Sequence, residues 1–199
     1  MTVRRISVIA SMSILMHHLV MFLVQVQGGR SWVSTTRRGD GTWYLYIAQH
    51  GYSLGQKLGD TTFYSPKSDL VFYPVLPGLT RLISFSGLSI HASAVLVVST
   101  AAVVATVWLF KFLELSTSTQ VAFTTAVLWI TQPFVVVLVT ILTESLFAMF
   151  TILTLYFWKQ NKKFIASFFL LADCLTRTTG AAIALTVIAV YLILSLIHI

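Results

Sequence analysis

The chain has 199 residues, of which 57% are hydrophobic and only 10% are charged, and its formal net charge is +7. A typical soluble domain has about a quarter of its residues charged, so this composition excludes a soluble globular enzyme. Disorder is excluded as well, because disordered chains combine low hydrophobicity with high charge. The composition therefore predicts a polytopic membrane protein. Its single cysteine, Cys174, cannot form a disulfide within the chain.

Residues 7–26 form the first predicted span. They are mostly apolar, and about twenty such residues cross a bilayer core of about 30 Å. Arg4 and Arg5 precede them, and residues 27–30 (Gln-Gly-Gly-Arg) lack the small-residue pattern of a signal-peptide cleavage site. We therefore expect an uncleaved span with a cytoplasmic N-terminus.

Residues 28–90 differ in composition and are predicted to form a long extracytoplasmic loop that carries interfacial helices. The loop is rich in Gly, Ser, Thr and aromatic residues, and Trp and Tyr favour the membrane–water interface. Its last part, residues 71–88, is apolar but contains Pro74, Pro77 and Arg81. An interfacial or re-entrant helix is expected there rather than a span.

The rest of the chain, residues 91–199, is predicted to form further spans of one membrane-embedded domain that covers residues 1–199. The apolar stretch 121–158 is too long for one helix, and Gln132-Pro133 predicts a break inside it. The spans are expected at 91–113, from 121 to about 130, from about 143 to 158, and at 164–176 and 181–196, with a hinge at 177–180. Because the chain ends inside an apolar helix, we expect a truncated protein whose later spans are missing.

The cations in the short connections predict the orientation, since the side richer in Lys and Arg faces the cytoplasm. One side has only Arg177, and the other has six cations: Arg4, Arg5, Lys111, Lys159, Lys162 and Lys163. Asp40, Glu144 and Arg177 are therefore all expected on the extracytoplasmic face. No nucleic-acid partner is expected, because the sequence has no nucleic-acid-binding motif.

Asp40 lies between Gly39 and Gly41, directly before a predicted interfacial helix. One interpretation is a helix N-cap whose carboxylate accepts backbone N–H bonds. The other is a carboxylate base displayed at the membrane surface. The two do not exclude each other, and the residues alone favour neither.

Glu144 and Arg177 are the other ionisable candidates. An acid near membrane depth is a functional candidate by default, although Glu144 could also be an interfacial acid at a helix N-terminus. Arg177 could recognise phosphate through its guanidinium fork. It could instead pair with Glu144 or Asp173, or contact lipid headgroups.

Two further pairs of polar residues receive simpler interpretations. For His17 and His18, inside the first span, packing or helix–helix hydrogen bonding is favoured over metal binding. For Arg37 and Arg38, a headgroup contact is favoured over substrate binding. The sequence has no CxxC, HExxH, P-loop or GxSxG motif, which argues against zinc, nucleotide and serine-hydrolase chemistry.

Four segments, in this order, are similar to the motifs of one enzyme family. Residues 40–52 have the pattern Asp-Gly-x-Trp-Tyr-x-x-Ile-Ala-x-x-Gly-Tyr, and residues 72–81 have Phe-Tyr-Pro-x-x-Pro-x-x-x-Arg. Residues 143–147 are Thr-Glu-Ser-Leu-Phe, and residues 177–180 are Arg-Thr-Thr-Gly. The set resembles the GPI mannosyltransferase family, meaning enzymes like the second-mannose transferase of GPI-anchor synthesis and their prokaryotic relatives. The departures from the family pattern remove no titrating group; they are Gly39, Tyr73 and Thr143.

The resemblance implies a GT-C glycosyltransferase fold and the transfer of a sugar, mannose in that family, from a polyprenyl-phosphate donor to an acceptor hydroxyl with inversion. Transfer would occur on the extracytoplasmic or lumenal face, in the plasma membrane of a prokaryote or the ER membrane of a eukaryote. The family is longer than this chain, which would be an N-terminal fragment of such an enzyme.

The resemblance also implies roles for particular residues. Asp40 would act as general base, and Glu144, the second catalytic residue, would orient substrate hydroxyls or hold Arg177. The substrate-binding residues would be Arg177, Arg81, Trp43, Tyr44 and Tyr73. No obligatory cofactor and no metal ligand set are expected. A divalent metal is left open, because Asp40 with a distant Asp60 or Asp69 does not define a site.

The expected partners are membrane lipids, the lipid-linked donor, and a glycan, lipid or protein acceptor. The alternative function is a small transporter or lipid-glycan flippase in which Glu144 and Arg177 form a gate. That function would predict internal repeats and polar residues at mid-span, and the sequence contains no convincing repeat.

Overall fold

The computed structural model describes residues 2–29, 31–37, 39–52 and 68–197. Within these residues every regular element is helical and no strand occurs, which confirms the all-α prediction. Arg38, Asp60 and the rest of residues 53–67 in the predicted long loop lie outside the described residues.

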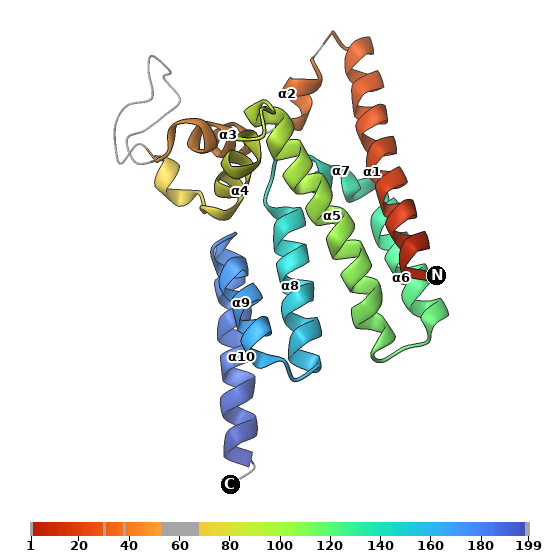
Figure 1. Cartoon of the computed structure of the whole chain (residues 1–199), viewed down its shortest axis with the longest axis vertical. Helices are drawn as coiled ribbons and strands as arrows, with labels where there is room; N and C mark the ends of the chain where they lie inside the picture. Colours follow the sequence, from red (N-terminus) through yellow and green to blue (C-terminus); the bar gives the residue numbers. More distant parts are fainter. Residues whose placement is uncertain (1, 30, 38, 53–67, 198–199) are drawn as a thin grey trace.

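Ten α-helices and two short 3₁₀ helices make up the described part of the chain (Figure 1). In chain order they are α1 (Thr2–Gln27), α2 (Trp32–Thr36), α3 (Gly41–His50), η1 (Ser68–Val71), α4 (Val75–Ser84), α5 (Ile90–Glu114), α6 (Thr119–Thr131), η2 (Pro133–Val135), α7 (Val136–Val139), α8 (Glu144–Lys159), α9 (Lys163–Cys174) and α10 (Thr178–Ile197).

Two described helices are long and apolar enough to cross a membrane, namely Thr2–Leu23 of α1 and the whole of α5. They correspond to the first two predicted spans and support a membrane protein. A third candidate is the pair formed by α6 and residues Pro133–Val139, which bends by 62° and counts only if the pair is one span. α4 is an apolar helix of 10 residues, in agreement with the prediction that this stretch does not span.

The structure corrects two details of the predicted spans. Helices form close to the predicted ranges 143–158 and 164–176, as α8 and α9. Their 16 and 12 residues are fewer than the about 20 that a perpendicular span needs. The hinge before α10 also differs from the predicted 177–180, because α10 begins at Thr178. The turn is therefore 175–177, and only Arg177 of the predicted hinge lies in it.

The break between α6 and α8 follows from local sequence. Pro133 has no backbone N–H, and Gln132 before it has the extended conformation typical of a residue that precedes proline. Thr140 is extended as well, and the backbone N–H of Ile141 donates to the carbonyl of Thr36 in α2 at 2.8 Å. This extended segment brings the start of α8 close to the residues that precede α3.

α5 is the central helix, with α8 and α4 packed on one side and α1 and α6 on the other (Figure 1). Its buried face is built from small and β-branched residues: Ala94, Val97, Val98, Ala101, Ala102 and Ala105. Small side chains allow the neighbouring backbones to approach closely, which is how helices associate in apolar surroundings.

Polar side chains join α1 to its neighbours. His18 Nε2 lies 3.0 Å from Ser99 Oγ in α5, and Ser13 Oγ donates to the carbonyl of Ile130 in α6 at 2.6 Å. His17 Nδ1 lies 2.8 Å from the carbonyl of Ser13 on the same helix. These contacts confirm helix–helix hydrogen bonding for His18 and a local packing role for His17.

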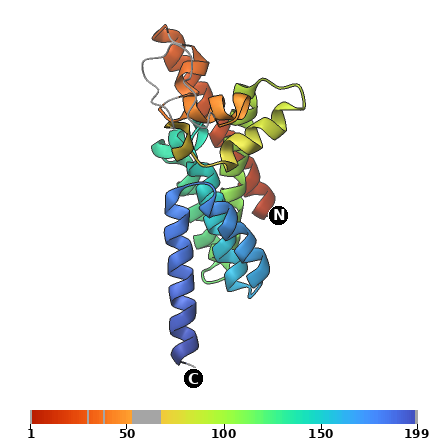
Figure 2. The same cartoon turned by 90° about the vertical axis from the view of Figure 1, so that its left-hand side faces the viewer.

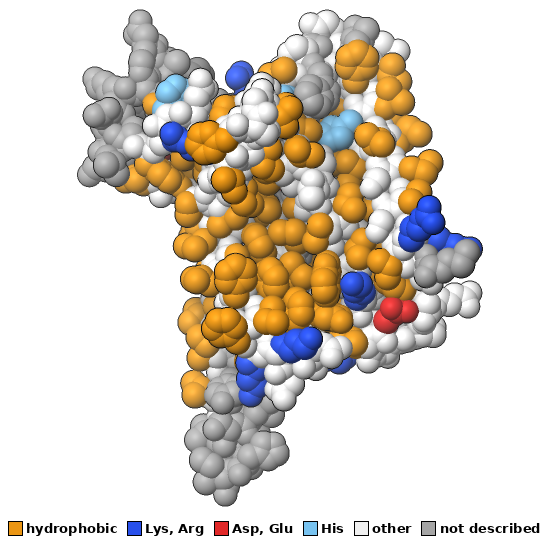
Figure 3. Space-filling model, viewed as in Figure 1, with side chains coloured by type: hydrophobic (Ala, Val, Ile, Leu, Met, Phe, Trp, Pro, Cys, Tyr) orange, Lys and Arg blue, Asp and Glu red, His pale blue; other side chains and the backbone are white. Residues whose placement is uncertain are grey.

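Different segments of the chain form the two ends of the helix bundle. α3, α4 and the starts of α5, α8 and α10 meet at one end, and the side view shows the first turn of α10 close to that end (Figure 2). The start of α1 and the α5–α6 and α8–α9 turns lie at the other end, where Lys and Arg side chains gather on the face seen in Figure 3.

Candidate functional site

A cavity of about 440 Å³ lies at the end of the bundle where α3, α8 and α10 begin. Four separate segments of the chain line it, with the residues Asp40, Tyr44, Val71, Phe72, Tyr73, Leu142, Thr143, Glu144, Arg177, Thr178 and Thr179. Five of the seven residues predicted for the site are among them. The structure thus brings together Asp40, Tyr44, Tyr73, Glu144 and Arg177.

Asp40 directly precedes α3 and is exposed. Its carbonyl accepts hydrogen bonds from the N–H groups of Trp43 and Tyr44, at 2.9 and 3.2 Å. Its side chain makes no capping hydrogen bond, so the interpretation of the carboxylate as an N-cap is wrong. The carboxylate is instead displayed at the cavity.

Gly41 explains why Asp40 lies so close to the start of α8. Gly41 is buried, and a Cβ at this position would lie 2.8 Å from the carbonyl oxygen of Ile141. Only glycine permits this approach between the first turn of α3 and the extended segment before Glu144. The predicted motif therefore contains a glycine that positions the neighbouring acid.

Glu144 and Arg177 form an ion pair, with Nη1 and Oε1 2.9 Å apart. Glu144 is the first residue of α8, where the helix dipole favours a carboxylate. Arg177 lies in the turn between α9 and α10, and its guanidinium lies 5.9 Å from the ring centre of Phe147. The side chain of Arg177 is 38% exposed and that of Glu144 is 30% exposed. The pair therefore contributes at most about 1 kcal/mol to stability.

The second oxygen of Glu144, Oε2, is buried and has no hydrogen-bond partner among the described residues. A buried acceptor without a partner costs about 1–3 kcal/mol. The interpretations of Glu144 as a helix N-terminal acid and as a partner of Arg177 are both confirmed. Neither accounts for the oxygen that is left without a donor.

Tyr44 lies among these charges and is only 7% exposed. Burial raises the pKa of its phenol, and the nearby carboxylates of Asp40 and Glu144 act in the same direction. A hydrogen bond with the Thr143 side chain and the charge of Arg177 oppose that rise in pKa. The phenol is therefore protonated at neutral pH and able to donate a hydrogen bond.

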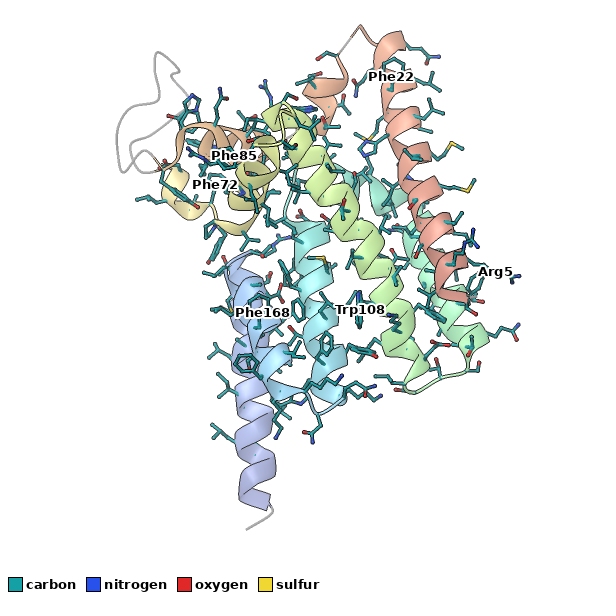
Figure 4. The ribbon with its side chains drawn as sticks, viewed as in Figure 1. Arg5, Phe22, Phe72, Phe85, Trp108 and Phe168 are labelled. Atoms are coloured by element: carbon teal, nitrogen blue, oxygen red, sulfur yellow. The ribbon has the colours of Figure 1, made fainter. Side chains whose placement is uncertain are left out.

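The aromatic wall of the cavity is centred on Phe72, which is labelled in Figure 4. Trp43 stacks on Phe72 with ring centres 5.4 Å apart, and Tyr44 meets it edge-on at 5.3 Å. Tyr73 Oη donates to Thr178 Oγ1 at 3.3 Å. The segment 71–74 is thus held between α3 and α10, and Trp43 acts on the cavity through Phe72 rather than by lining it.

Arg81 does not line the cavity. It is exposed in the last turn of α4, seven residues after Pro74, and a helix rises about 1.5 Å per residue. That rise carries its backbone about 10 Å away along the helix axis. The structure therefore does not bring Arg81 to the place predicted for it as a second phosphate-binding residue.

Six residues that line the cavity were not predicted as site residues, among them Phe72, Thr178 and Thr179. Phe72 and the two threonines do lie within the motifs at 72–81 and 177–180. Unlike the ionisable and phenolic members of those motifs, they have no feature in the sequence that distinguishes them from packing residues. Their aromatic and hydroxyl groups place a stacking surface and two hydrogen-bonding groups at the cavity.

A second, more apolar cavity of about 730 Å³ adjoins the first. The two share Val71, Phe72, Tyr73 and Thr178, and the second is completed by Tyr52, Leu70, Pro74 and Leu175. Tyr52 Oη donates to the carbonyl of Phe72 at 2.7 Å, which ties the shared wall to the end of α3. A charged cavity and an apolar cavity therefore lie on the two sides of one aromatic wall.

Within the described residues, no group of three or more His, Cys, Asp or Glu side chains could hold a metal ion. Comparison with known protein families, with curated proteins and with solved structures found no match to this chain. The function is therefore argued from the geometry of the cavity and from the chemistry of its side chains.

Proposed function

We propose that this protein transfers a hexose, mannose by its resemblance to the GPI mannosyltransferases, from a polyprenyl-phosphate donor to an acceptor hydroxyl. One observation carries the proposal: a carboxylate that makes no capping hydrogen bond, an Arg–Glu pair and a buried tyrosine line one cavity that adjoins an apolar one. A sugar phosphate on an isoprenoid chain has matching parts, namely a polar ring, an anion and a long apolar tail.

Asp40 acts as the general base in this proposal. Its carboxylate takes the proton from the acceptor hydroxyl while the hydroxyl oxygen attacks the anomeric carbon. The bond between that carbon and the phosphate oxygen breaks on the opposite face, so the configuration inverts, as in single-displacement glycosidases. The leaving polyprenyl phosphate keeps the electron pair.

Arg177 stabilises the leaving group, because its guanidinium meets the charge that develops on the phosphate. Glu144 keeps the guanidinium in place with Oε1, and its Oε2 is available to a sugar hydroxyl. Tyr44 donates a hydrogen bond to the substrate, and Tyr73 contributes to the wall between the two cavities. The apolar cavity accommodates the first isoprene units of the donor.

The proposed reaction belongs to the extracytoplasmic or lumenal face of a multi-pass membrane protein with a GT-C-like arrangement. The support is the positive-inside rule: Arg4, Lys111 and Lys159 lie at the end of the bundle opposite the cavity. A donor that enters from the bilayer also fits the lack of nucleotide-binding motifs.

The test is a transfer assay in membranes with labelled polyprenyl-phosphate mannose. Asp40→Asn should lower the rate by about 10²–10⁴, the usual contribution of a general base, at an unchanged protein level. Glu114→Gln, which removes an exposed acid at the end of α5, is the matched control and should have no effect. Near-normal transfer by Asp40→Asn would refute the assignment.

The two arginines supply a second comparison. Arg177→Gln should impair the use of donor more than the use of acceptor, whereas Arg81→Gln should leave both unchanged because Arg81 lies outside the cavity. Equal effects of the two substitutions would count against a phosphate-binding role for Arg177. Movement of intact donor across the membrane without sugar transfer would instead favour the flippase.

A further inference from the structure

A separate groove lies at the opposite end of the bundle, between the start of α1 and α6. It has a volume of about 370 Å³ and is lined by Arg4, Arg5, Val8, Ile9 and Phe123. None of these residues belongs to the cavity of the proposed function. The groove therefore requires its own explanation.

Two cationic and three apolar residues line the groove. Arg4 and Arg5 are exposed near the end of α1, and Figure 4 shows Arg5 projecting from the first turns of this helix. Val8 and Ile9 follow one turn later, about 5–6 Å along the axis. All four residues belong to the candidate span Thr2–Leu23, with the arginines in its first turn. Basic side chains at the end of a membrane-spanning helix reach the headgroup level, so in a membrane the apolar lining residues would extend toward the hydrocarbon region.

Two other cations at this end, Lys111 and Lys159, contact partners within the chain. The Lys111 ammonium lies 4.3 Å from the ring centre of Trp108, and Lys159 donates a hydrogen bond to Ser116. Neither Arg4 nor Arg5 forms an ion pair with any carboxylate in the part of the chain that the structure describes. Both guanidiniums lie in one groove beside apolar side chains, which suits them to bind an external anion that carries an apolar chain.

We propose that this groove binds one anionic phospholipid, with its phosphate between Arg4 and Arg5 and an acyl chain along Val8, Ile9 and Phe123. Guanidinium forks match phosphate oxygens in geometry and in charge. Because the groove joins two helices, the bound lipid fastens the start of α1 against α6, where Ile6 packs on Ala122 and Ala126. The proposal does not depend on sugar transfer.

The test uses the purified full chain in detergent, where membrane orientation has no influence. Native mass spectrometry counts bound lipid, and thermal unfolding follows stabilisation. Long-chain phosphatidylglycerol is the probe, phosphatidylcholine is the uncharged comparison, and dihexanoyl phosphatidylglycerol and inorganic phosphate separate the headgroup from the acyl chain. We expect one tightly bound long-chain phosphatidylglycerol, with at least tenfold weaker binding of the other three.

Arg4→Gln/Arg5→Gln should weaken phosphatidylglycerol binding at least tenfold with unchanged helix content. Lys162→Gln/Lys163→Gln removes the same charge beside the α8–α9 turn and should bind lipid like the unmodified chain. Equal losses in the two double variants would overturn the proposal in favour of diffuse attraction. Wild-type binding by the arginine variant, or equal stabilisation by phosphate alone or by phosphatidylcholine, would overturn it as well.

Discussion

Gly180 is the residue at which the geometry of the cavity is most sensitive to a single methyl group. A Cβ built on Gly180 would lie 2.3 Å from the carbonyl oxygen of Asp173, 2.5 Å from its carbonyl carbon and 2.7 Å from the nitrogen of Cys174. All three are backbone atoms at the end of α9, so no side chain can rotate away. Gly180→Ala must therefore displace the start of α10 from the end of α9.

The displacement acts directly on Arg177. The carbonyl of Asp173 accepts hydrogen bonds from the N–H groups of Thr176 and Arg177, and the N–H of Gly180 donates to the carbonyl of Arg177 at 2.9 Å. Relieving the clash requires a shift of about 1 Å, since carbon atoms pack at about 3.5 Å. A shift of that size in the turn carries the guanidinium away from Glu144.

The expected loss of stability follows from two opposing terms. Overpacking a close contact destabilises the folded protein by about 2–3 kcal/mol. Replacing a helical glycine by alanine stabilises it by about 0.5–1 kcal/mol. The net loss of about 1–2.5 kcal/mol should lower the melting temperature in detergent by about 2–10 °C. Transfer should fall about 10²-fold, because a misplacement of 1 Å at a reacting centre has that effect.

Gly78→Ala is the matched control for this substitution. Gly78 lies in α4, and a Cβ there would meet nothing within 4 Å, so alanine should be neutral or slightly stabilising. If Gly180→Ala stabilised the protein as Gly78→Ala does, the close approach of α9 and α10 would be refuted, and with it the argument that the turn positions Arg177.

Two further substitutions test the neighbouring parts of the site. Gly41→Ala brings a methyl group 2.8 Å from the carbonyl of Ile141; it should displace Asp40 and lower transfer about tenfold or more in the same assay, and unchanged transfer would contradict the role given to this contact. Glu144→Gln keeps the shape of the side chain but removes the charge that holds Arg177, so it should raise KM for the donor. The melting temperature should change by less than about 4 °C, because a partly exposed ion pair contributes at most about 1 kcal/mol to stability. A larger drop in melting temperature would show that the pair is mainly structural.

The positions of many helices along the chain could be predicted from the sequence, because they depend on signals that are local. The apolar lengths of α1 and α5 and the break at Pro133 follow from composition and from the missing N–H of proline. The ranges of α8 and α9 were predicted to within two residues, but helices of 16 and 12 residues are shorter than the about 20 that a perpendicular span needs. Hydrophobicity alone does not locate the residue at which a helix ends.

The candidate site was predicted in part, for a different physical reason. Placing an ionisable group near a membrane costs free energy, so such groups are rare in an apolar sequence and easily recognised. This is why the sequence could identify Asp40, Glu144 and Arg177. Arg81 satisfies the same criterion, yet α4 carries it away from the cavity. Phe72 is apolar in an apolar chain, so its role as the centre of the aromatic wall is visible only in three dimensions.

The meeting of Glu144 and Arg177 depends on helix length rather than on either motif. α8 descends through 16 residues from Glu144 to Lys159, and α9 returns through only 12, which leaves it about 6 Å short of the level of Glu144. The turn 175–177 and the long side chain of Arg177 make up that difference, and Gly180 lets α10 begin without moving the turn aside. A shorter side chain at position 177 would not reach the carboxylate, and one more turn in α9 would carry the guanidinium past it. The charges at this cavity are therefore positioned by the unequal lengths of two packed helices, a relation between distant segments that inspection of any one of them does not reveal.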